Sequence, residues 1–296
     1  MNYSLRSRIL FVALLLVSIL VLPTLAGFPV KIIDDRGKEI TISKRPERIV
    51  IAGPALYGEV LVDLGAAARV VGVTDSADNP PEFAKLEKLG SVFAPNIEKI
   101  IALKPDLVFG TFGKPRDALE AAGLIVVTTS PIESSLDVFK TVRTVGLAID
   151  GEALKADTLV GRSSESIVID EAKVLERAKP TVAILYPSAE APPFAAGSET
   201  PENEILLRAG GQNIFGDIAS YKQVNFEELI KRNPEIIITD PSQISLITGN
   251  KLLKDLKAVK AGKVLGVKAS AWTSSRIAST LREVAKLLHP DVFKEK

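Results

Sequence analysis

One short sequence segment occurs twice in this chain in similar form, first as NIEKIIALKPDLVFG at residues 96–110 and again as NFEELIKRNPEIIIT at residues 225–239. The two copies align without a gap, so that Asn96 matches Asn225 and Glu98 matches Glu227. A solenoid needs at least three adjacent repeats to bury its core, whereas these two copies lie far apart. The repeat therefore predicts two similar lobes.

Each copy predicts one helix followed by one strand. Asparagine is a favoured helix N-cap, because its side chain accepts a hydrogen bond from a backbone N–H of the first turn. Apolar residues then recur at helical spacing, and the acid in the first turn suits the helix dipole. A proline pushes the residue before it, Lys104 or Asn233, out of the helical region, so each helix should end there. The apolar runs that follow, residues 107–109 and 236–238, are typical of strands buried in a parallel sheet.

The rest of the chain also alternates strands with helices, which indicates an α/β fold with mostly parallel sheets. For the first lobe the pattern predicts a hairpin at residues 30–42, strands at 48–53, 68–74 and 124–129, and helices at 55–64 and 116–122. For the second lobe it predicts strands at 181–187 and 263–267 and helices at 201–209 and 275–288. Apolar residues at helical spacing predict one long helix over residues 153–178. The predicted fold class is two Rossmann-like lobes joined by one long α-helix.

The N-terminus has the pattern of a secretory signal. Arg6 and Arg8 precede an apolar run at residues 9–22, and small residues follow at Thr24 and Ala26. We expect export and cleavage after Ala26; an uncleaved N-terminal anchor is the alternative, although the run is short for a span of roughly 20 residues. The predicted parts are a signal peptide at residues 1–26, an N-terminal lobe at 27–150, a connecting helix at 151–179 and a C-terminal lobe at 180–296.

Composition argues against several classes of protein. Without residues 1–26 the chain has 35 basic residues (37 less Arg6 and Arg8) and 36 acidic ones, so it lacks the basic footprint of nucleic-acid binding. There is no cysteine, and we therefore expect no disulfide bond and a periplasmic or extracytoplasmic protein that is not a lipoprotein. The single histidine, His289, ends the last predicted helix, where a structural role is expected. No site for a bare zinc or manganese ion is predicted.

The sequence contains no catalytic constellation. It has no cysteine, no second histidine, and no glycine-rich phosphate loop of the G-x-G-x-x-G or P-loop type. We therefore expect a protein that is not an enzyme and that needs no cofactor.

Four stretches, in this order, resemble the periplasmic substrate-binding proteins of ABC importers that take up ferric siderophores, haem and cobalamin. They are VKIIDDRGKEITISKRPERIV, LGAAARVVGVT with the first repeat copy, PPFAAGSETPENEILLRAGGQNIFGD, and the second repeat copy with LKAVKAGKVLGV. The resemblance covers about residues 29–290. It implies a ligand cleft between two lobes joined by a long helix. It also implies an ABC permease dimer, with its cytoplasmic ATPase, as the partner.

The resemblance assigns a role to the matched acids of the repeat. In that family one acid on each lobe docks on arginines of the permease, and the matching residues here are Glu98 and Glu227. The alternative is that both are ordinary first-turn acids favoured by the helix dipole.

Ligands of open α/β sheets bind beyond the carboxyl ends of the strands, so we expect the site on the loops there. Matching with cobalamin-binding members selects Pro54, Ser76, Val92, Thr111, Phe194 and Trp272. Those members carry aromatic residues where this chain has Ser76, Val92 and Thr111. The full set of predicted ligand-binding residues is Pro54, Tyr57, Ser76, Phe93, Thr111, Phe112, Phe194, Trp272 and Arg276. For Trp272 a core position is the alternative, and Arg276 could simply open the last helix on its solvent side.

The resemblance implies the solute-binding component of an ABC importer, acting as a monomer without nucleic acid. The expected ligand is a metal chelate, with a ferric siderophore ahead of cobalamin, another corrinoid or haem. An oxyanion binder and a surface protein without a transport role are the remaining alternatives.

Overall fold

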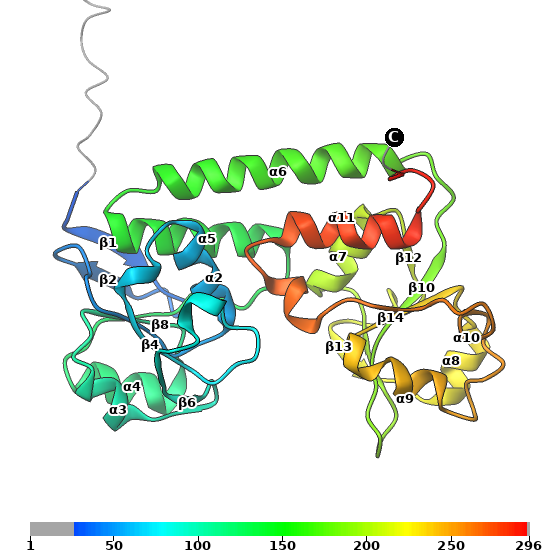
Figure 1. Ribbon diagram of the computed structural model, residues 1–296, viewed down its shortest axis with the longest axis horizontal. Coiled ribbons are helices and arrows are strands. Elements are labelled where there is room, and N and C mark those ends of the chain that lie inside the picture. The colour runs from blue at the N-terminus through cyan, green and yellow to red at the C-terminus, as the bar shows by residue number, and fades with distance from the viewer. Residues whose placement is uncertain (1–26, 295–296) are drawn as a thin grey trace, which may run out of the picture.

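The structure, a computed structural model, describes residues 27–294 and contains two α/β lobes bridged by helices (Figure 1). The predicted signal segment lies outside the described residues. Within residues 27–294, no helix is both long and apolar enough to span a membrane.

The N-terminal lobe is built on a parallel sheet with the strand order β5-β4-β3-β8-β9. The strands are β3 (Ile49–Ile51), β4 (Val70–Val73), β5 (Glu87–Lys88), β8 (Leu107–Phe109) and β9 (Val126–Val127). All three residues of β3 and of β8 are buried, as the unbroken apolar runs predict. The other elements of this lobe are the hairpin β1 (Val30–Ile33) and β2 (Glu39–Ile42), the hairpin β6 (Gly90–Ser91) and β7 (Ala94–Pro95), and the helices α2 (Ala55–Asp63), α3 (Ile97–Ala102) and α4 (Gly113–Ala121).

The C-terminal lobe has a mixed sheet. Its parallel part consists of β10 (Thr181–Tyr186), β12 (Gln212–Asn213), β14 (Ile236–Thr239) and β15 (Val264–Gly266). The strands β11 (Phe194–Ala196) and β13 (Tyr221–Gln223) extend it with antiparallel pairs, which the sequence pattern did not predict. The helices are α7 (Pro201–Arg208), α8 (Phe226–Arg232), α9 (Ile244–Thr248), α10 (Lys257–Lys260) and α11 (Ile277–Leu288). Short 3₁₀ segments occur at Ala67–Arg69, Pro81–Phe83, Pro241–Gln243 and Ala269–Thr273.

The two copies of the repeated unit occupy equivalent places. β8 lies between β3 and β9, and β14 lies between β10 and β15. Both asparagines cap their helices, because Asn96 Oδ1 accepts from Lys99 N at 2.9 Å and Asn225 Oδ1 accepts from Glu228 N at 2.7 Å. The helices end before the prolines as predicted. The residues that precede the prolines leave the helix in the left-handed conformation, with φ of 47° at Lys104 and 43° at Asn233.

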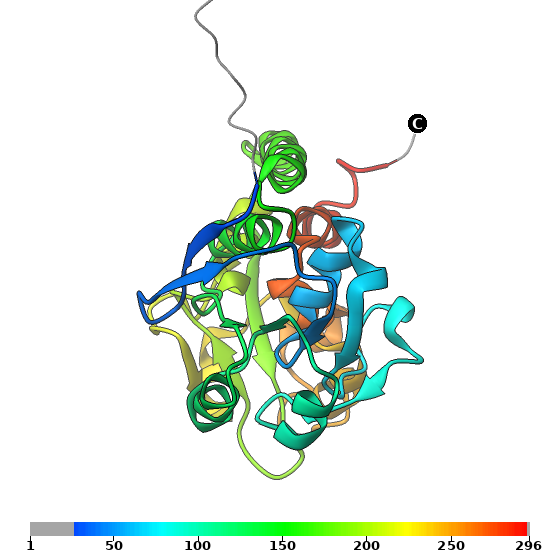
Figure 2. The ribbon, with the colours of Figure 1, turned by 90° about the vertical axis from the view of Figure 1, so that its left-hand side faces the viewer.

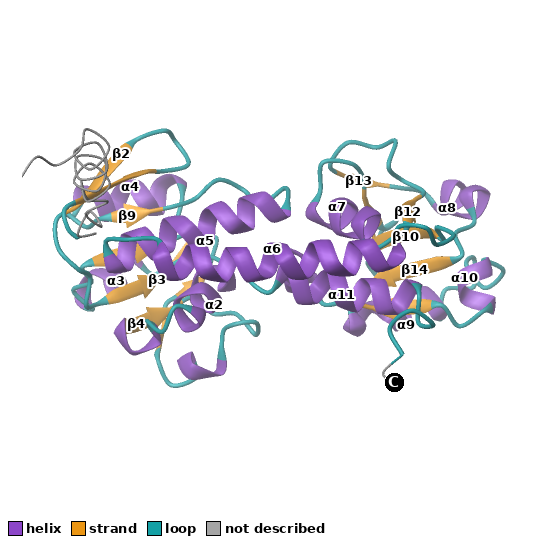
Figure 3. Ribbon diagram, turned by 90° about the horizontal axis from the view of Figure 1, so that it is seen from above, coloured by secondary structure: helices purple, strands orange, loops and turns teal. Residues whose placement is uncertain are grey.

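The predicted connecting helix is confirmed as α6 (Leu154–Val174), which ends four residues earlier than the sequence pattern indicated. α5 (Ser135–Asp150) precedes it, and Gly151 separates the two helices with a φ of 75°. α6 packs against α5 and α11, and Figure 2 shows it standing above both. Seen from above in Figure 3, α6 runs from one lobe to the other. One hydrophobic cluster includes residues of both sheets and of these helices, so the lobes share a continuous core below α6.

Candidate functional site

A pocket of about 450 Å³ lies where the sheet of the N-terminal lobe ends. The loops after β3, β8 and β9 line it, as the rule for open α/β sheets predicts. The loop before α11, in the other lobe, contributes Thr273. The lining residues are Asp35, Pro54, Leu56, Tyr57, Gly110, Phe112, Thr128, Thr129, Ser130, Pro131, Ile132 and Thr273.

Three predicted ligand-binding residues, Pro54, Tyr57 and Phe112, line this pocket. Tyr57 is only 3% exposed, and its Oη bonds to Thr129 Oγ1 and accepts from Thr129 N, both at 2.9 Å. Its ring stacks on Phe109. Burial raises the pKa of Tyr57, so its hydroxyl stays protonated at neutral pH. Tyr57 therefore acts as a fixed wall of the pocket.

Phe93 and Phe112 form an exposed aromatic pair beside the pocket. Their rings meet edge to face with centroids 6.4 Å apart, and Phe93 is 82% exposed. Phe93 lies in the turn of the β6–β7 hairpin, where Ser91 Oγ accepts from Phe93 N at 3.2 Å. Phe93 itself is not part of the pocket lining, but through Phe112 it extends the apolar surface outward from the pocket.

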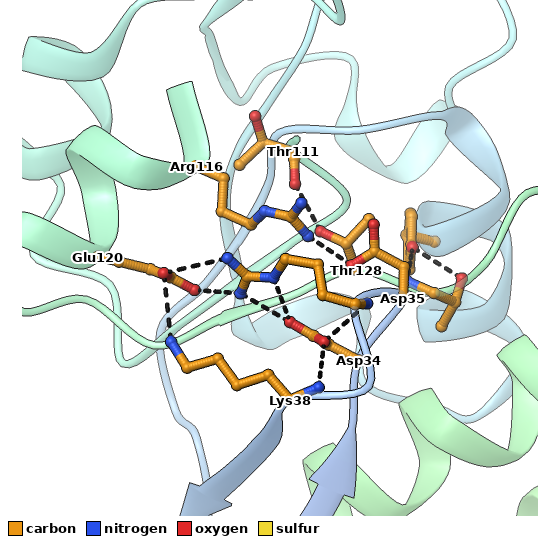
Figure 4. A network of polar contacts seen from close by, with 10 residues as sticks. Asp34, Asp35, Lys38, Thr111, Arg116, Glu120 and Thr128 are labelled. Carbon is orange, nitrogen blue, oxygen red and sulfur yellow. Dashed lines mark hydrogen bonds and ion pairs between the residues drawn. The ribbon is translucent and has the colours of Figure 1, made fainter. Parts of the chain in front are cut away.

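Asp35, which lines the pocket, meets a second charged residue, Arg116, in the network of polar contacts that Figure 4 shows from close by. The Arg116 side chain donates to the carboxylate of Asp35, and Arg116 is 7% exposed. Asp35 N donates to Thr128 O at 2.9 Å, which ties the β1–β2 turn to the end of β9. Arg116 is buried because α4 packs against the β1–β2 turn, where Arg116 pairs with Asp35 and Glu120 pairs with Arg36.

The other predicted ligand-binding residues lie outside the pocket lining. Thr111 is 1% exposed, and its hydroxyl has no hydrogen-bond partner among the described residues. Ser76 is partly buried, and its hydroxyl accepts from Asp78 N at 3.2 Å. Val92 is partly buried in the same hairpin turn as Phe93.

Trp272 requires a correction. It is 1% exposed and belongs to the main hydrophobic cluster, so it is a core residue in this structure and not a contact for a ligand. The 3₁₀ segment Ala269–Thr273 packs on α7 and α11, which buries the ring. Its neighbour Thr273 reaches the pocket instead.

Arg276 is the N-cap residue of α11, and its guanidinium lies 3.5 Å from the carboxylate of Asp63 on α2. Three donors of the same segment bind carboxylates of α2. Ser274 Oγ and Ser275 N donate to Glu59 Oε2 at 2.6 and 2.9 Å, and Ser275 Oγ donates to Asp63 Oδ2 at 2.8 Å. These contacts join the two lobes and hold Thr273 against the pocket. Arg276 therefore serves the lobe interface in this structure.

Phe194 lies in the C-terminal lobe, next to a buried carboxylate. Glu202 is 3% exposed and accepts from the hydroxyl of Tyr186 and, at 2.7 Å, from Tyr221 Oη. Phe194 pairs with Tyr186 across β10 and β11 and is 48% exposed. Burial raises the pKa of both tyrosines, and the charge of Glu202 raises it further. The sequence pattern missed this cluster, because Glu202 reads as an ordinary first-turn acid of α7.

The sequence pattern also missed several pocket residues, among them Asp35, Thr128, Thr129 and Ser130. For Thr128, Thr129 and Ser130 the sequence did contain a signal that could have identified them. The strand predicted at residues 124–129 also ends at the carboxyl edge of the sheet, where ligands bind. For Asp35 no such signal existed, since it lies in a hairpin turn that leads away from the parallel sheet.

The matched acids Glu98 and Glu227 are both exposed, in the first turns of α3 and α8. Within residues 27–294 neither forms an ion pair. Figure 1 shows α3 and α8 in different lobes, both below α6.

Two further observations concern metals. Among the described residues, no group of three or more His, Cys, Asp or Glu is placed to hold a metal ion. His289 is 6% exposed, and its Nε2 lies 3.2 Å from Gly210 O, which agrees with the structural role expected for it.

Known proteins resemble this chain over most of its length. A family model described as "Periplasmic binding protein" matches residues 50–271. An uncharacterized ABC transporter substrate-binding lipoprotein, YvrC of Bacillus subtilis (strain 168), is 31% identical over 279 residues, which cover 90% of this chain and 88% of that protein. The vitamin B12-binding protein of Vibrio parahaemolyticus is 27% identical over 214 residues, covering 70% of this chain and 75% of the relative.

Solved structures share the fold. The periplasmic haem-binding protein RhuT from Roseiflexus sp. RS-1, in apo form, superposes with a TM-score of 0.75 at 24% identity, covering 83% of this chain and 99% of RhuT. A protein of the ABC-type Fe³⁺-hydroxamate transport system from Saccharomonospora viridis superposes with a TM-score of 0.74 at 22% identity, covering 88% of this chain and 99% of that protein. The predicted fold class is thus confirmed.

One prediction from composition is contradicted. The Bacillus subtilis relative is a lipoprotein, so the expectation that this protein is not a lipoprotein conflicts with the similarity. The lack of cysteine excludes only attachment of a lipid through a cysteine side chain. It does not support the broader prediction that the protein is not a lipoprotein. The extracytoplasmic part of the prediction is supported by the same relative.

The match to the family model and the similarity to YvrC agree with the two-lobe fold and its pocket. They show a substrate-binding protein of an ABC transporter, and not an enzyme. Its function implies a small-molecule ligand and a membrane permease with its ATPase as partners. This chain belongs to the periplasmic binding protein family.

Proposed function

We propose that this protein captures a ferric siderophore outside the cytoplasm and delivers it to the permease of an ABC importer. The observation that carries the choice of ligand is the lining of the pocket. Its walls are apolar at Pro54, Leu56, Phe112 and Ile132, and no lysine or arginine is among the lining residues. A hydroxamate siderophore supplies its own oxygen ligands to the iron and has no need of a cationic pocket. Apolar contact with a few placed polar groups suits such a ligand.

The alternatives fit this lining less well. Haem carries two carboxylates, and burying a carboxylate without a donor is costly. Cobalamin-binding members carry aromatic residues where this chain has Ser76, Val92 and Thr111, so the aromatic surface here is reduced to Phe93 and Phe112. The similarity to a vitamin B12-binding protein keeps a corrinoid as the second candidate.

Isothermal titration calorimetry with a ferric trihydroxamate, cyanocobalamin and haemin tests the proposal. We expect the ferric trihydroxamate to bind with a Kd in the micromolar range or below, which corresponds to about −8 kcal/mol or better. Because Trp272 is buried, heat is a safer signal here than quenching of tryptophan fluorescence. Binding of cyanocobalamin or haemin together with no binding of the ferric chelate would contradict the proposal.

We also propose that Glu98 and Glu227 dock on the permease, and that the protein acts as a monomer. The equivalent positions of the two acids in the repeat, and their exposure, support the first proposal. Light scattering coupled to size exclusion tests the second, and a dimer mass at micromolar concentration would refute it.

A further inference from the structure

The lining of the pocket contains hydrogen-bond acceptors and no lysine or arginine. Asp35 carries the only carboxylate among the lining residues. Its side chain is 20% exposed. One oxygen, Oδ1, accepts from Arg116, and within residues 27–294 no donor reaches Oδ2. The second carboxylate oxygen is therefore available to a group that enters the pocket.

Thr128 adds a second acceptor at the same place. The Thr128 hydroxyl donates to Thr111 O at 2.5 Å, so its one proton is already used. Only the lone pairs of the hydroxyl oxygen remain, and these can accept a hydrogen bond. The hydrogen bond from Asp35 N to Thr128 O keeps the two side chains on neighbouring segments. Figure 4 shows both beside Arg116.

Arg116 sits behind Asp35 and does not line the pocket. Among the described residues Asp35 is its one side-chain partner, and Arg116 Nε is buried without a partner. The arginine thus lowers the cost of keeping a carboxylate in the lining of an apolar pocket, and is not itself among the lining residues.

We propose that Asp35 selects ligands by the group they place at the pocket floor, favouring a hydrogen-bond donor such as an ammonium or an amide N–H and rejecting a carboxylate. A carboxylate there would face the Asp35 carboxylate and Thr128 Oγ1 with no lysine or arginine in the lining to pair with it, so discrimination comes from an unpaired charge as well as from the favourable contact. The inference rests on the proposed function and narrows its substrate class to chelates that end in a donor.

The test uses two ferric trihydroxamates that differ only at one end, where one carries a free ammonium and the other is the same molecule succinylated to carry a carboxylate. Calorimetry on the full chain should give at least tenfold tighter binding of the ammonium form, which is about 1.4 kcal/mol.

In Asp35→Asn the ratio of the two dissociation constants, carboxylate form over ammonium form, should fall toward one, because an amide can both donate and accept. Glu120→Gln is the matched control. Glu120 lies one turn after Arg116 on α4 and pairs with Arg36 and Lys38 outside the pocket, so the ratio should not change.

The Arg116→Gln variant distinguishes an effect on ligand recognition from a general loss of protein stability. Without the arginine, the charge of Asp35 is no longer balanced, and the preference for the ammonium form should rise above that of the original protein. General destabilisation would not move the two variants in opposite directions, and melting curves confirm that each is folded. Equal binding of both chelates, or a ratio unchanged in Asp35→Asn, would overturn the inference alone. No binding of either chelate to the original protein would overturn the proposed function, and the inference with it.

Discussion

At the scale of single residues, two glycines let the strand ends of the pocket approach each other. A Cβ on Gly53 would lie 2.5 Å from Gly110 Cα, closer than real Cβ atoms come to backbone. Gly110 has a φ of 88°, and a Cβ there would lie 2.6 Å from Tyr57 Cε2. Because the Tyr57 ring is held from behind by Phe109, it has little room to move. The wall of the pocket at Tyr57 and Gly110 therefore depends on these two glycines.

We expect Gly110→Ala to destabilise the protein and to weaken ligand binding. The left-handed conformation costs a residue with a Cβ about 1–2 kcal/mol, and crowding against Tyr57 adds about 1–3 kcal/mol. Gly113→Ala is the matched control, since Gly113 has a φ of 59° but open space around its Cβ position. Chemical denaturation should give a clearly smaller loss for Gly113→Ala. Equal losses in the two variants would show that crowding at Tyr57 plays no part.

At the scale of elements, the two repeated helices end in the same way with different residues. Lys104 and Asn233 both adopt a positive φ, which asparagine tolerates better than lysine. Asn233 also uses its side chain, because Asn233 Oδ1 accepts from Lys257 N at 2.9 Å at the start of α10. Lys104 Nζ has no such bond among the described residues.

Glycine substitution should therefore have opposite effects at these two positions. Lys104→Gly should stabilise the protein by about 0.5–1 kcal/mol, the relief of left-handed strain less the added freedom of glycine in the unfolded chain. Asn233→Gly should destabilise it, because the bond to Lys257 N is lost. Urea denaturation of both variants checks the signs, and a loss of stability in Lys104→Gly would refute the argument.

A second element-scale contact joins α6 to α11 through a buried carboxylate. Asp170 is 0% exposed and accepts from Arg282 Nε at 2.6 Å and Lys173 Nζ at 2.8 Å. Burial by itself raises the pKa of a carboxyl group, but the bonds from Arg282 and Lys173 outweigh it and lower the pKa of Asp170. The lowered pKa means that Asp170 stabilises the fold above about pH 4, near its unfolded value. This contribution is lost as the pH falls through the folded pKa.

Asp170→Asn should cost about 1–3 kcal/mol of unfolding free energy at pH 7, because charged donors lose their partner. Acidification below about pH 4 should make the difference between original and variant shrink, since the original then loses its carboxylate too. Glu171→Gln is the neighbouring control; its pair with Arg208 is partly exposed, so its cost should stay below about 1 kcal/mol. Urea denaturation at several pH values measures both, and a difference that grows on acidification would contradict the assignment.

At the scale of the whole molecule, the repeat places one exposed acid on each lobe. In the docking proposed above, a permease dimer would offer two matching surfaces, and paired charges across such an interface set orientation and speed encounter more than they add affinity. Exposed first-turn acids contribute only about 0.3–1 kcal/mol each to stability. Both acids can therefore be replaced with little effect on the fold.

The double variant Glu98→Arg/Glu227→Arg should keep its ligand affinity and melting temperature but lose uptake through the cognate permease, because like charges would then face each other. Glu87→Arg/Glu228→Arg, which changes two other acids of the same lobes, serves as the charge-matched control for uptake. Normal uptake by the first variant would refute docking, and loss of ligand binding would place these residues in the cleft instead.

Much of the fold was predictable from local pattern. The helix and strand of each repeat copy, the hairpin at residues 30–42 and the long connecting helix were all confirmed, with differences of a few residues at their ends. The strands β11 and β13 were not predicted, since they are short and lie in a region rich in loops. Of the predicted site, Pro54, Tyr57 and Phe112 line the pocket, whereas Trp272 is in the core.

The sequence by itself determined the order of the elements, their ends and the equivalence of the two lobes. Capping, proline and apolar spacing act between residues a few positions apart, so they can be read along the chain. Only the tertiary structure decided which side chains face the ligand. Asp35 and Arg116 are 81 residues apart, and Glu59 and Ser274 are 215 apart. Whether such groups meet, and whether Trp272 is covered, depends on how distant elements pack, and no local pattern carries that information.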